Sequence, residues 1–68
     1  MPKETFLNLS KEKQNKILNA AKKEFERVSL EQASIKNIVE EAGIARGSFY
    51  QYFESKEDLM RIYYKQSF

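Results

Sequence analysis

The chain contains no cysteine and no histidine, and among its 68 residues there are only two glycines and one proline. Without thiol or imidazole groups it forms no disulfides and no thiolate or imidazole zinc site. It also has no cysteine nucleophile or histidine base for catalysis. Few glycines and prolines leave few positions where a helix must stop. These absences favour an all-α domain and exclude several classes of enzyme and metalloprotein.

Long apolar runs are missing as well. No segment approaches the roughly 20 apolar residues that a membrane-spanning helix needs. The opening stretch MPKETFLNLSKEK lacks the continuous apolar segment of a secretion signal. A chain of this length has room for one hydrophobic core only. We therefore expect a single cytoplasmic domain with no membrane partner.

Charge of one sign is not strongly in excess, because 12 Lys and Arg residues face 10 Asp and Glu residues. The net charge of +2 is compatible with nucleic-acid binding, but the positions of the charges decide that question. Adjacent carboxylates at Glu40 and Glu41 and at Glu57 and Asp58 diverge on a helix, and so small a bundle is not expected to contain a catalytic cleft. We expect neither an enzyme nor a cofactor.

A first amphipathic helix is predicted from Ser10 to about Val28. Ser10 can accept a hydrogen bond from a free amide of the first turn. Ile17, Ala21, Phe25 and Val28 then recur at spacings of four and three residues, with Lys, Asn and Glu between them. This period is typical of a helix with one buried face.

Two short helices should follow, joined by a tight turn. Ser34 is a candidate N-cap for the first of them, which ends at Gly43, a residue able to adopt the left-handed conformation. The second begins around Ala45 or Arg46. This pattern, braced by a long preceding helix, predicts a helix-turn-helix over residues 34–53.

A fourth helix is expected after the third one ends near Glu54. Ser55 followed three residues later by Asp58 approximates a capping box. Apolar residues then continue the pattern towards the C-terminus, at positions 59, 60, 62 and 63. Residues 55–68 are therefore predicted to be the start of this fourth helix.

The third predicted helix has features suited to a DNA groove. Phe49 and Phe53 lie one turn apart and should anchor it inward. Four residues should then face outward or lie on the flanks, namely Arg46, Gly47, Tyr50 and Gln51. Arg can pair with guanine edges or with phosphate, and Gln with adenine. Gly47 and the small Ser48 would let the backbone approach a duplex. Alternatively, Gly47 only relieves packing against the preceding helix.

Other residues around this helix are suited to phosphate oxygens. Tyr50 and Tyr52 each carry a hydroxyl on a rigid stem, although Tyr52 can equally be a core residue with a wet tip. Lys56 in the first turn of the fourth helix places a cation beside free amides, an arrangement that suits an anion. Lys36, early in the second helix, can act from the other side.

Three segments of the chain resemble the N-terminal DNA-binding domain of tetracycline-repressor-type (TetR) transcriptional regulators. They are KILNAAKKEFE, SIKNIVEEAGIARGSFYQYF and SKEDL, and together they cover roughly residues 10–63. A chance match is improbable because three segments must fit with the right spacing. The resemblance implies a homodimer that binds near-palindromic double-stranded DNA, with a small-molecule effector bound by a C-terminal domain that is absent here. It also implies repression as the usual mode of regulation.

The resemblance divides the chain into three parts: an N-terminal arm (1–9), a three-helix DNA-binding domain (10–54) and a fourth helix (55–68) that leads toward an effector and dimerisation domain. On this basis the chain is expected to be one part of a longer protein. The DNA-binding positions that the resemblance implies are Ser34, Lys36, Arg46, Gly47, Ser48, Tyr50, Gln51, Tyr52 and Lys56.

Three positions depart from the family pattern. Ser29 stands where Gly commonly ends the first helix, so either a costly left-handed cap or a different turn is expected. Ala45 replaces the usual Ser or Thr cap of the recognition helix, and Val39 replaces a smaller Ala. A second interpretation of the chain remains open, namely a small helical protein-interaction module whose FYQYF surface binds a partner helix and not DNA.

Overall fold

The computed structural model describes residues 3–66 and is all-helical over that range. The helices are α1 (Glu4–Leu7), α2 (Lys11–Arg27), α3 (Ile35–Ala42), α4 (Arg46–Tyr52) and α5 (Lys56–Gln66). The all-α prediction is confirmed, with the helix-turn-helix formed by α3 and α4. No helix within residues 3–66 is both long enough and apolar enough to cross a membrane.

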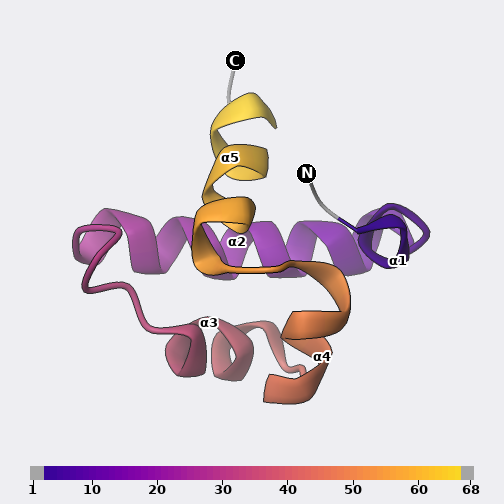
Figure 1. Ribbon diagram of the computed structural model, residues 1–68, viewed down its shortest axis with the longest axis horizontal. Helices are drawn as coiled ribbons and strands as arrows, with labels where there is room; N and C mark the ends of the chain where they lie inside the picture. The colour runs from indigo at the N-terminus through magenta and orange to yellow at the C-terminus, as the bar shows by residue number, and fades with distance from the viewer. Residues whose placement is uncertain (1–2, 67–68) are drawn as a thin grey trace.

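The long helix α2 is the scaffold on which the others pack. In Figure 1 it runs horizontally, with α3 and α4 beneath it, α5 rising across it and α1 beside one end. Contacts join α2 to α3 and α5, α3 to α4, and α1 to α4. The helix-turn-helix is thereby presented on one side of the molecule.

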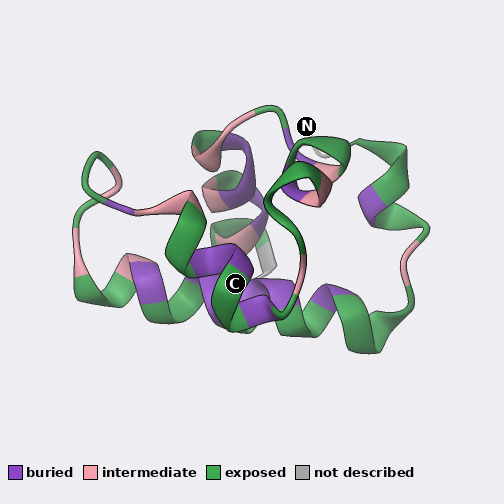
Figure 2. Cartoon of the chain, turned by 90° about the horizontal axis from the view of Figure 1, so that it is seen from below, coloured by how far each residue is buried: buried purple, intermediate pink, exposed green. Residues whose placement is uncertain are grey.

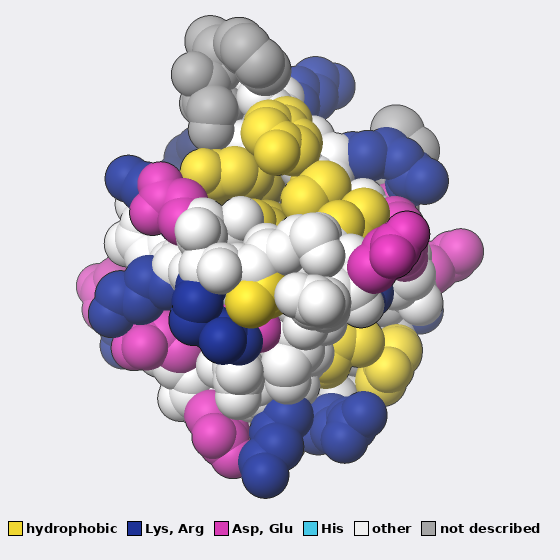
Figure 3. All heavy atoms as spheres, turned by 90° about the vertical axis from the view of Figure 1, so that its left-hand side faces the viewer, with side chains coloured by type: hydrophobic (Ala, Val, Ile, Leu, Met, Phe, Trp, Pro, Cys, Tyr) yellow, Lys and Arg dark blue, Asp and Glu magenta, His cyan; other side chains and the backbone are white. Residues whose placement is uncertain are grey.

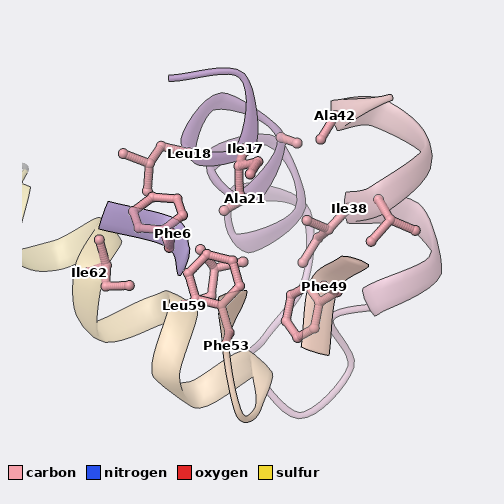
Figure 4. Close-up of a cluster of buried hydrophobic side chains, with 12 residues drawn as sticks. Phe6, Ile17, Leu18, Ala21, Ile38, Ala42, Phe49, Phe53, Leu59 and Ile62 are labelled. Carbon is pink, nitrogen blue, oxygen red and sulfur yellow. The ribbon is translucent and has the colours of Figure 1, made fainter. Parts of the chain in front are cut away.

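The core lies where these helices meet. Its largest fully buried side chains are Phe6, Ile17, Ile38, Phe49, Phe53 and Leu59. Figure 4 shows them converging from all five helices, with the three phenylalanines and Leu59 near the centre. Buried positions form stripes along the helices, and the opposite faces are exposed (Figure 2). This is the pattern that the apolar spacing predicts.

The predicted helix ends are confirmed in detail. Ser10 accepts a hydrogen bond from the Lys13 amide at 3.2 Å, and Ser34 accepts one from the Asn37 amide at 3.1 Å. Gly43 ends α3 with φ +74°, in the left-handed region that glycine adopts without a Cβ penalty.

The capping box of α5 is also present, but the bond accepted by Asp58 comes from the residue before the N-cap and not from the N-cap itself. Ser55 Oγ accepts from the Asp58 amide at 3.3 Å, and Asp58 Oδ2 accepts from the amide of Glu54 at 3.2 Å. The reciprocal bond of a standard capping box goes to the N-cap amide itself. Two backbone donors before and within the first turn are satisfied in this way.

The departures from the family pattern have visible consequences. At the end of α2, Val28 adopts an extended conformation with φ −141°, and no residue other than glycine has positive φ within residues 3–66. Ser29 therefore avoids the left-handed cap, and the turn differs. Ala45 provides no side-chain cap to α4.

The N-terminal segment, expected as an arm, folds onto the domain. Its described part contains the single-turn helix α1, and Phe6 is completely buried, with its ring centroid 4.9 Å from that of Phe53. A helix of one turn is too short to be stable alone. It forms here because the core takes up Phe6.

Candidate nucleic-acid interface

A hollow of about 480 Å³ lies where the beginnings of α3, α4 and α5 meet; we call it the basic groove. It brings together five of the predicted site residues: Ser34, Lys36, Arg46, Tyr50 and Lys56. Glu54 and Glu57 also line it, so the groove is not uniformly cationic. Residues that are up to 22 positions apart in the sequence, from 34 to 56, thus share one surface.

Helix α4 presents a polar face beside the basic groove. Phe49 is fully buried and Phe53, which ends the helix, is fully buried too, whereas Tyr50 is 45% exposed. Arg46 and Gln51 are exposed, as predicted. The exposed face follows from the 3.6-residue period, since the two phenylalanines fix which side of the helix faces the core.

Gly47 and Ser48 lie in the first turn of α4. Gly47 is exposed, and a Cβ built on it would meet no atom within 4 Å. Relief of packing against α3 is therefore not the reason for glycine at this position. Ser48 is half-buried. A small exposed residue at the front of α4 leaves the backbone open to close approach.

Tyr52 lies on the opposite side of α4 from Tyr50, because two residues rotate a helix by about 200°. It is half-buried against the core and lines a second hollow of about 220 Å³. Lys13 and Lys16 of α2 line the same hollow. Neither lysine was predicted to lie beside α4. Their three-residue spacing predicts that they lie on the same face of α2, but it does not predict which helix lies next to that face.

Lys56 makes contacts within the protein. Its ammonium group donates hydrogen bonds to the carbonyl oxygens of Glu31 at 2.8 Å and of Ala33 at 3.1 Å. These carbonyls belong to the loop between α2 and α3. An ammonium group has three donors, so one remains for another acceptor. Lys56 therefore ties α5 to the loop before α3 at the edge of the basic groove.

Lys36 and Arg46, unlike Lys56, are not engaged with carbonyls of the protein within residues 3–66. Both side chains are exposed, and within residues 3–66 neither forms a salt bridge. Ser34 Oγ, by contrast, is already used as the cap of α3. The unpaired cations of the basic groove are thus on α3 and at the start of α4.

The orientation of α3 depends on Glu24, a buried carboxylate of α2 whose role was not predicted from the sequence. Glu24 accepts from the Ser34 amide at 2.7 Å and from both Arg27 nitrogens at 2.8 and 3.2 Å. Asn37 Nδ2 approaches the same carboxylate at 3.4 Å. Burial raises the pKa of Glu24, but the bonds from Arg27 and Ser34 outweigh burial and hold it below its ordinary value.

Charged side chains of both signs are spread over the face that Figure 3 shows. In Figure 3, Lys and Arg side chains stand out at the lower edge, on the side where α3 and α4 lie in Figure 1. Hydrophobic side chains gather higher up, toward α5. Lys and Arg side chains also lie elsewhere on this face, so the basic groove is defined by its lining residues and not by a cationic end of the molecule.

Comparison with known proteins agrees with this geometry. Residues 17–61 match the family model described as bacterial regulatory proteins, tetR family. The chain is 47% identical to a TetR family transcriptional regulator of known structure from Chloroflexus aurantiacus J-10-FL, with a TM-score of 0.81. That match covers 87% of this chain and 27% of the other.

Two proteins of Bacillus subtilis (strain 168) are also similar. The HTH-type transcriptional regulator YfiR, described as uncharacterized, is 45% identical over 49 residues, which are 72% of this chain and 24% of YfiR. YvdT, described in the same way, is 45% identical over 60 residues, or 88% of this chain and 28% of YvdT. The chain thus spans about a quarter of the length of these relatives. The family consists of regulatory proteins, not enzymes, and the chain belongs to it: this is a domain of the tetR family of bacterial regulatory proteins.

Proposed function

We propose that this chain is the sequence-specific DNA-binding domain of a transcriptional regulator and that α4 enters the major groove of double-stranded DNA. The observation that carries the proposal is the basic groove. It gathers Lys36, Arg46 and Lys56, together with the exposed Tyr50, along one side of the second helix of a helix-turn-helix. In such motifs the second helix reads base edges with its N-terminal residues.

The dimensions of α4 suit this role. A helix with its side chains is about 10–12 Å across, which fits the roughly 12 Å width of the major groove, and the seven residues of α4 make about two turns. Basic side chains lie on both flanks: Lys36 in the basic groove, and Lys13 and Lys16 beside Tyr52 in the second hollow. A helix in the major groove has a phosphate backbone on either side, so cations on both flanks fit a duplex.

The proposed roles follow from these positions. Arg46 and Gln51 would reach base edges, while Gly47 and Ser48 allow close approach of the helix. The Tyr50 hydroxyl would donate to a phosphate, as would Tyr52 from the other flank. These residues extend the set in the basic groove, so that α4 provides both base contacts and phosphate contacts.

The start of α3 and the start of α5 provide the remaining phosphate contacts. Lys36 would pair with a phosphate as an unengaged cation, and Ser34 places the α3 N-terminus toward the same strand. Lys56 would use its third donor. Because two of its donors already go to loop carbonyls, its main contribution is to hold the loop in place.

The relatives extend the proposal to the whole protein. They are named transcriptional regulators and are about three times as long as this chain. We propose a homodimer acting in the cytoplasm on a near-palindromic operator as a repressor, with an effector bound by the part of the protein beyond this domain. Two linked half-sites would raise the affinity well above that of one domain.

DNA binding can be tested by fluorescence anisotropy across a salt series. The probes are a labelled duplex enriched by the wild-type chain from a random-sequence pool and a scrambled duplex of the same length. We expect tighter binding to the enriched duplex and a steep loss of affinity with salt. Arg46→Met should weaken binding and reduce the preference for the enriched duplex, by about 1–3 kcal/mol if Arg46 contacts a base.

Lys22→Met is the matched control, because Lys22 is an exposed residue of α2 that lines neither hollow. Each substitution removes one positive charge. Equal losses of affinity for the two variants would show that binding follows net charge and not α4. Failure of the wild type to bind any duplex at low salt would contradict the proposal and favour a protein-interaction module.

A further inference from the structure

We propose that the N-terminal segment Lys3–Phe6 is a clamp that fixes the C-terminal end of α4, and that Lys3 and Thr5 are positioning residues for this helix. We call this segment the N-terminal clamp. The inference rests on the proposed function, since it concerns how the DNA-reading helix is held. It assigns a role to a segment that precedes the region shared with the family model.

Three consecutive carbonyl oxygens of α4 accept hydrogen bonds from the N-terminal clamp. The Lys3 ammonium donates to the carbonyl of Tyr50 at 2.7 Å, and the Lys3 amide donates to that of Tyr52 at 3.0 Å. The Thr5 hydroxyl donates to the carbonyl of Gln51, which lies between them. Two residues thus engage the last three carbonyls of the helix.

Helix α4 has little else to define its ends. The last four carbonyls of any helix lack partners within the helix, so these acceptors need donors from elsewhere. At the other end Ala45 gives no side-chain cap, and Gly47 lowers the helix propensity. Seven residues are also fewer than an isolated helix needs. The Lys3 ammonium further suits the negative end of the helix dipole.

The clamp itself is anchored to the rest of the fold. Phe6 is completely buried, with its ring 4.9 Å from Phe53, the residue that ends α4. The side-chain amide of Gln14 on α2 donates to the carbonyls of Leu7 and Leu9 at 3.2 and 2.9 Å. The N-terminal clamp is therefore a bridge from α2 to the end of α4, and not a loose extension.

The position of the clamp bears on recognition. The carbonyls that it holds belong to Tyr50, Gln51 and Tyr52, whose side chains contact phosphates and bases in the proposed function. Without the clamp the last turn of α4 frays more often, and only the intact helix binds DNA. The apparent dissociation constant then rises in proportion as the intact fraction falls.

The first test is hydrogen exchange of the free chain, which needs no DNA. In the double variant Lys3→Met/Thr5→Val the amides of the last turn of α4 should exchange roughly tenfold faster or more, because two hydrogen bonds are lost. Amides of α2 should change much less. The single variant Thr5→Ser keeps the hydroxyl, so the amides of the last turn of α4 should keep most of their protection from exchange. Ser10→Ala, which removes the cap of α2, is the control for a general loss of stability.

The second test measures affinity for the enriched duplex at a temperature where every variant is folded. The double variant should bind about twofold more weakly or worse, with an unchanged slope of log affinity against log salt, while Ser10→Ala binds like the wild type. A slope smaller by about 0.9 for Lys3→Met would show a direct phosphate contact and overturn the positioning role.

Other outcomes are equally clear. Unchanged exchange in α4, or wild-type affinity of the double variant, would overturn the clamp even if the wild type binds DNA. Absence of DNA binding by the wild-type chain would overturn the proposed function instead. In that case the exchange experiment alone still decides whether the segment fixes α4.

Discussion

Replacing Gly47 by alanine should stabilise the free domain while weakening DNA binding. The added methyl group would meet no atom within 4 Å, and Gly47 does not have positive φ, so the fold opposes the substitution neither sterically nor through the backbone. Alanine is favoured over glycine in a helix by up to about 1 kcal/mol. We expect a gain of about 0.5–1 kcal/mol, less than the full value because the position lies in the first turn of α4.

Urea and thermal unfolding followed by the helical circular dichroism signal measure this gain. For a domain of this size, 0.5–1 kcal/mol corresponds to a rise in Tm of about 2–8 °C. Gly43→Ala is a control of opposite sign: no atom is close to its added Cβ either, but its φ is +74°. That substitution should destabilise by about 1–2 kcal/mol, the penalty of a left-handed conformation.

The same Gly47→Ala variant should lose affinity for the enriched duplex. If α4 lies in the groove with its first turn against the DNA, a methyl group forced into that contact costs about 1–3 kcal/mol, roughly a five- to more than hundredfold loss. A destabilised variant would refute the inference that glycine is not required by the fold. A stabilised variant with wild-type affinity would refute close approach of the DNA to Gly47.

Two further substitutions test residues that the structure places in unexpected roles. Lys56→Met should destabilise the free chain by about 1–2 kcal/mol in urea unfolding, because two loop carbonyls lose a charged donor. Lys36→Met should leave stability unchanged. Equal effects of the two substitutions would contradict the role of Lys56 in holding the loop before α3. Glu24→Gln should cost about 1–2 kcal/mol at neutral pH, because the carboxylate is bonded to Arg27 and to the start of α3. The folded pKa of Glu24 lies below its ordinary value of 4.5, so its contribution is fully present above pH 4.5 and is lost as the pH falls through the folded pKa. The stability difference between wild type and Glu24→Gln should therefore shrink toward zero in acid, and a difference that persists there would contradict this role for the ionised carboxylate.

Local signals in the sequence were sufficient for most of the fold. Ser10, Ser34 and Gly43 mark helix ends through bonds that span three or four residues, so their roles can be predicted without knowledge of the tertiary structure. The inward positions of Phe49 and Phe53 follow likewise from the helical period alone.

What the sequence did not reveal depends on long-range contacts. Phe6 lies in a segment with no helical period, and its burial is visible only once α4 and α5 are in place. Glu24 looks like one more exposed carboxylate of an amphipathic helix, yet it holds the amide of a residue ten positions later. Lys56 was expected at a phosphate, and its loop acceptors lie 23 and 25 positions away.

In the candidate interface, too, local features could be predicted from the sequence and long-range contacts could not. The outward positions of Arg46 and Gln51 were predictable from the period of α4. The separation of Tyr50 and Tyr52 to opposite flanks follows from the same period, but the hollows beside them require the packed helices. Lys13 and Lys16 could not be assigned to the second hollow without the position of α2 relative to α4.

The most direct test of DNA recognition by α4 is a titration of the labelled chain with the enriched duplex, followed through its backbone amide resonances. The largest changes should fall on Lys36, on residues 46–51 and on Lys56, with small changes along the outer face of α2 around Lys22. Changes centred instead on Phe25 and Tyr63, whose rings lie 6.0 Å apart where α2 meets α5, would contradict DNA recognition by α4. So would an unchanged spectrum at saturating duplex.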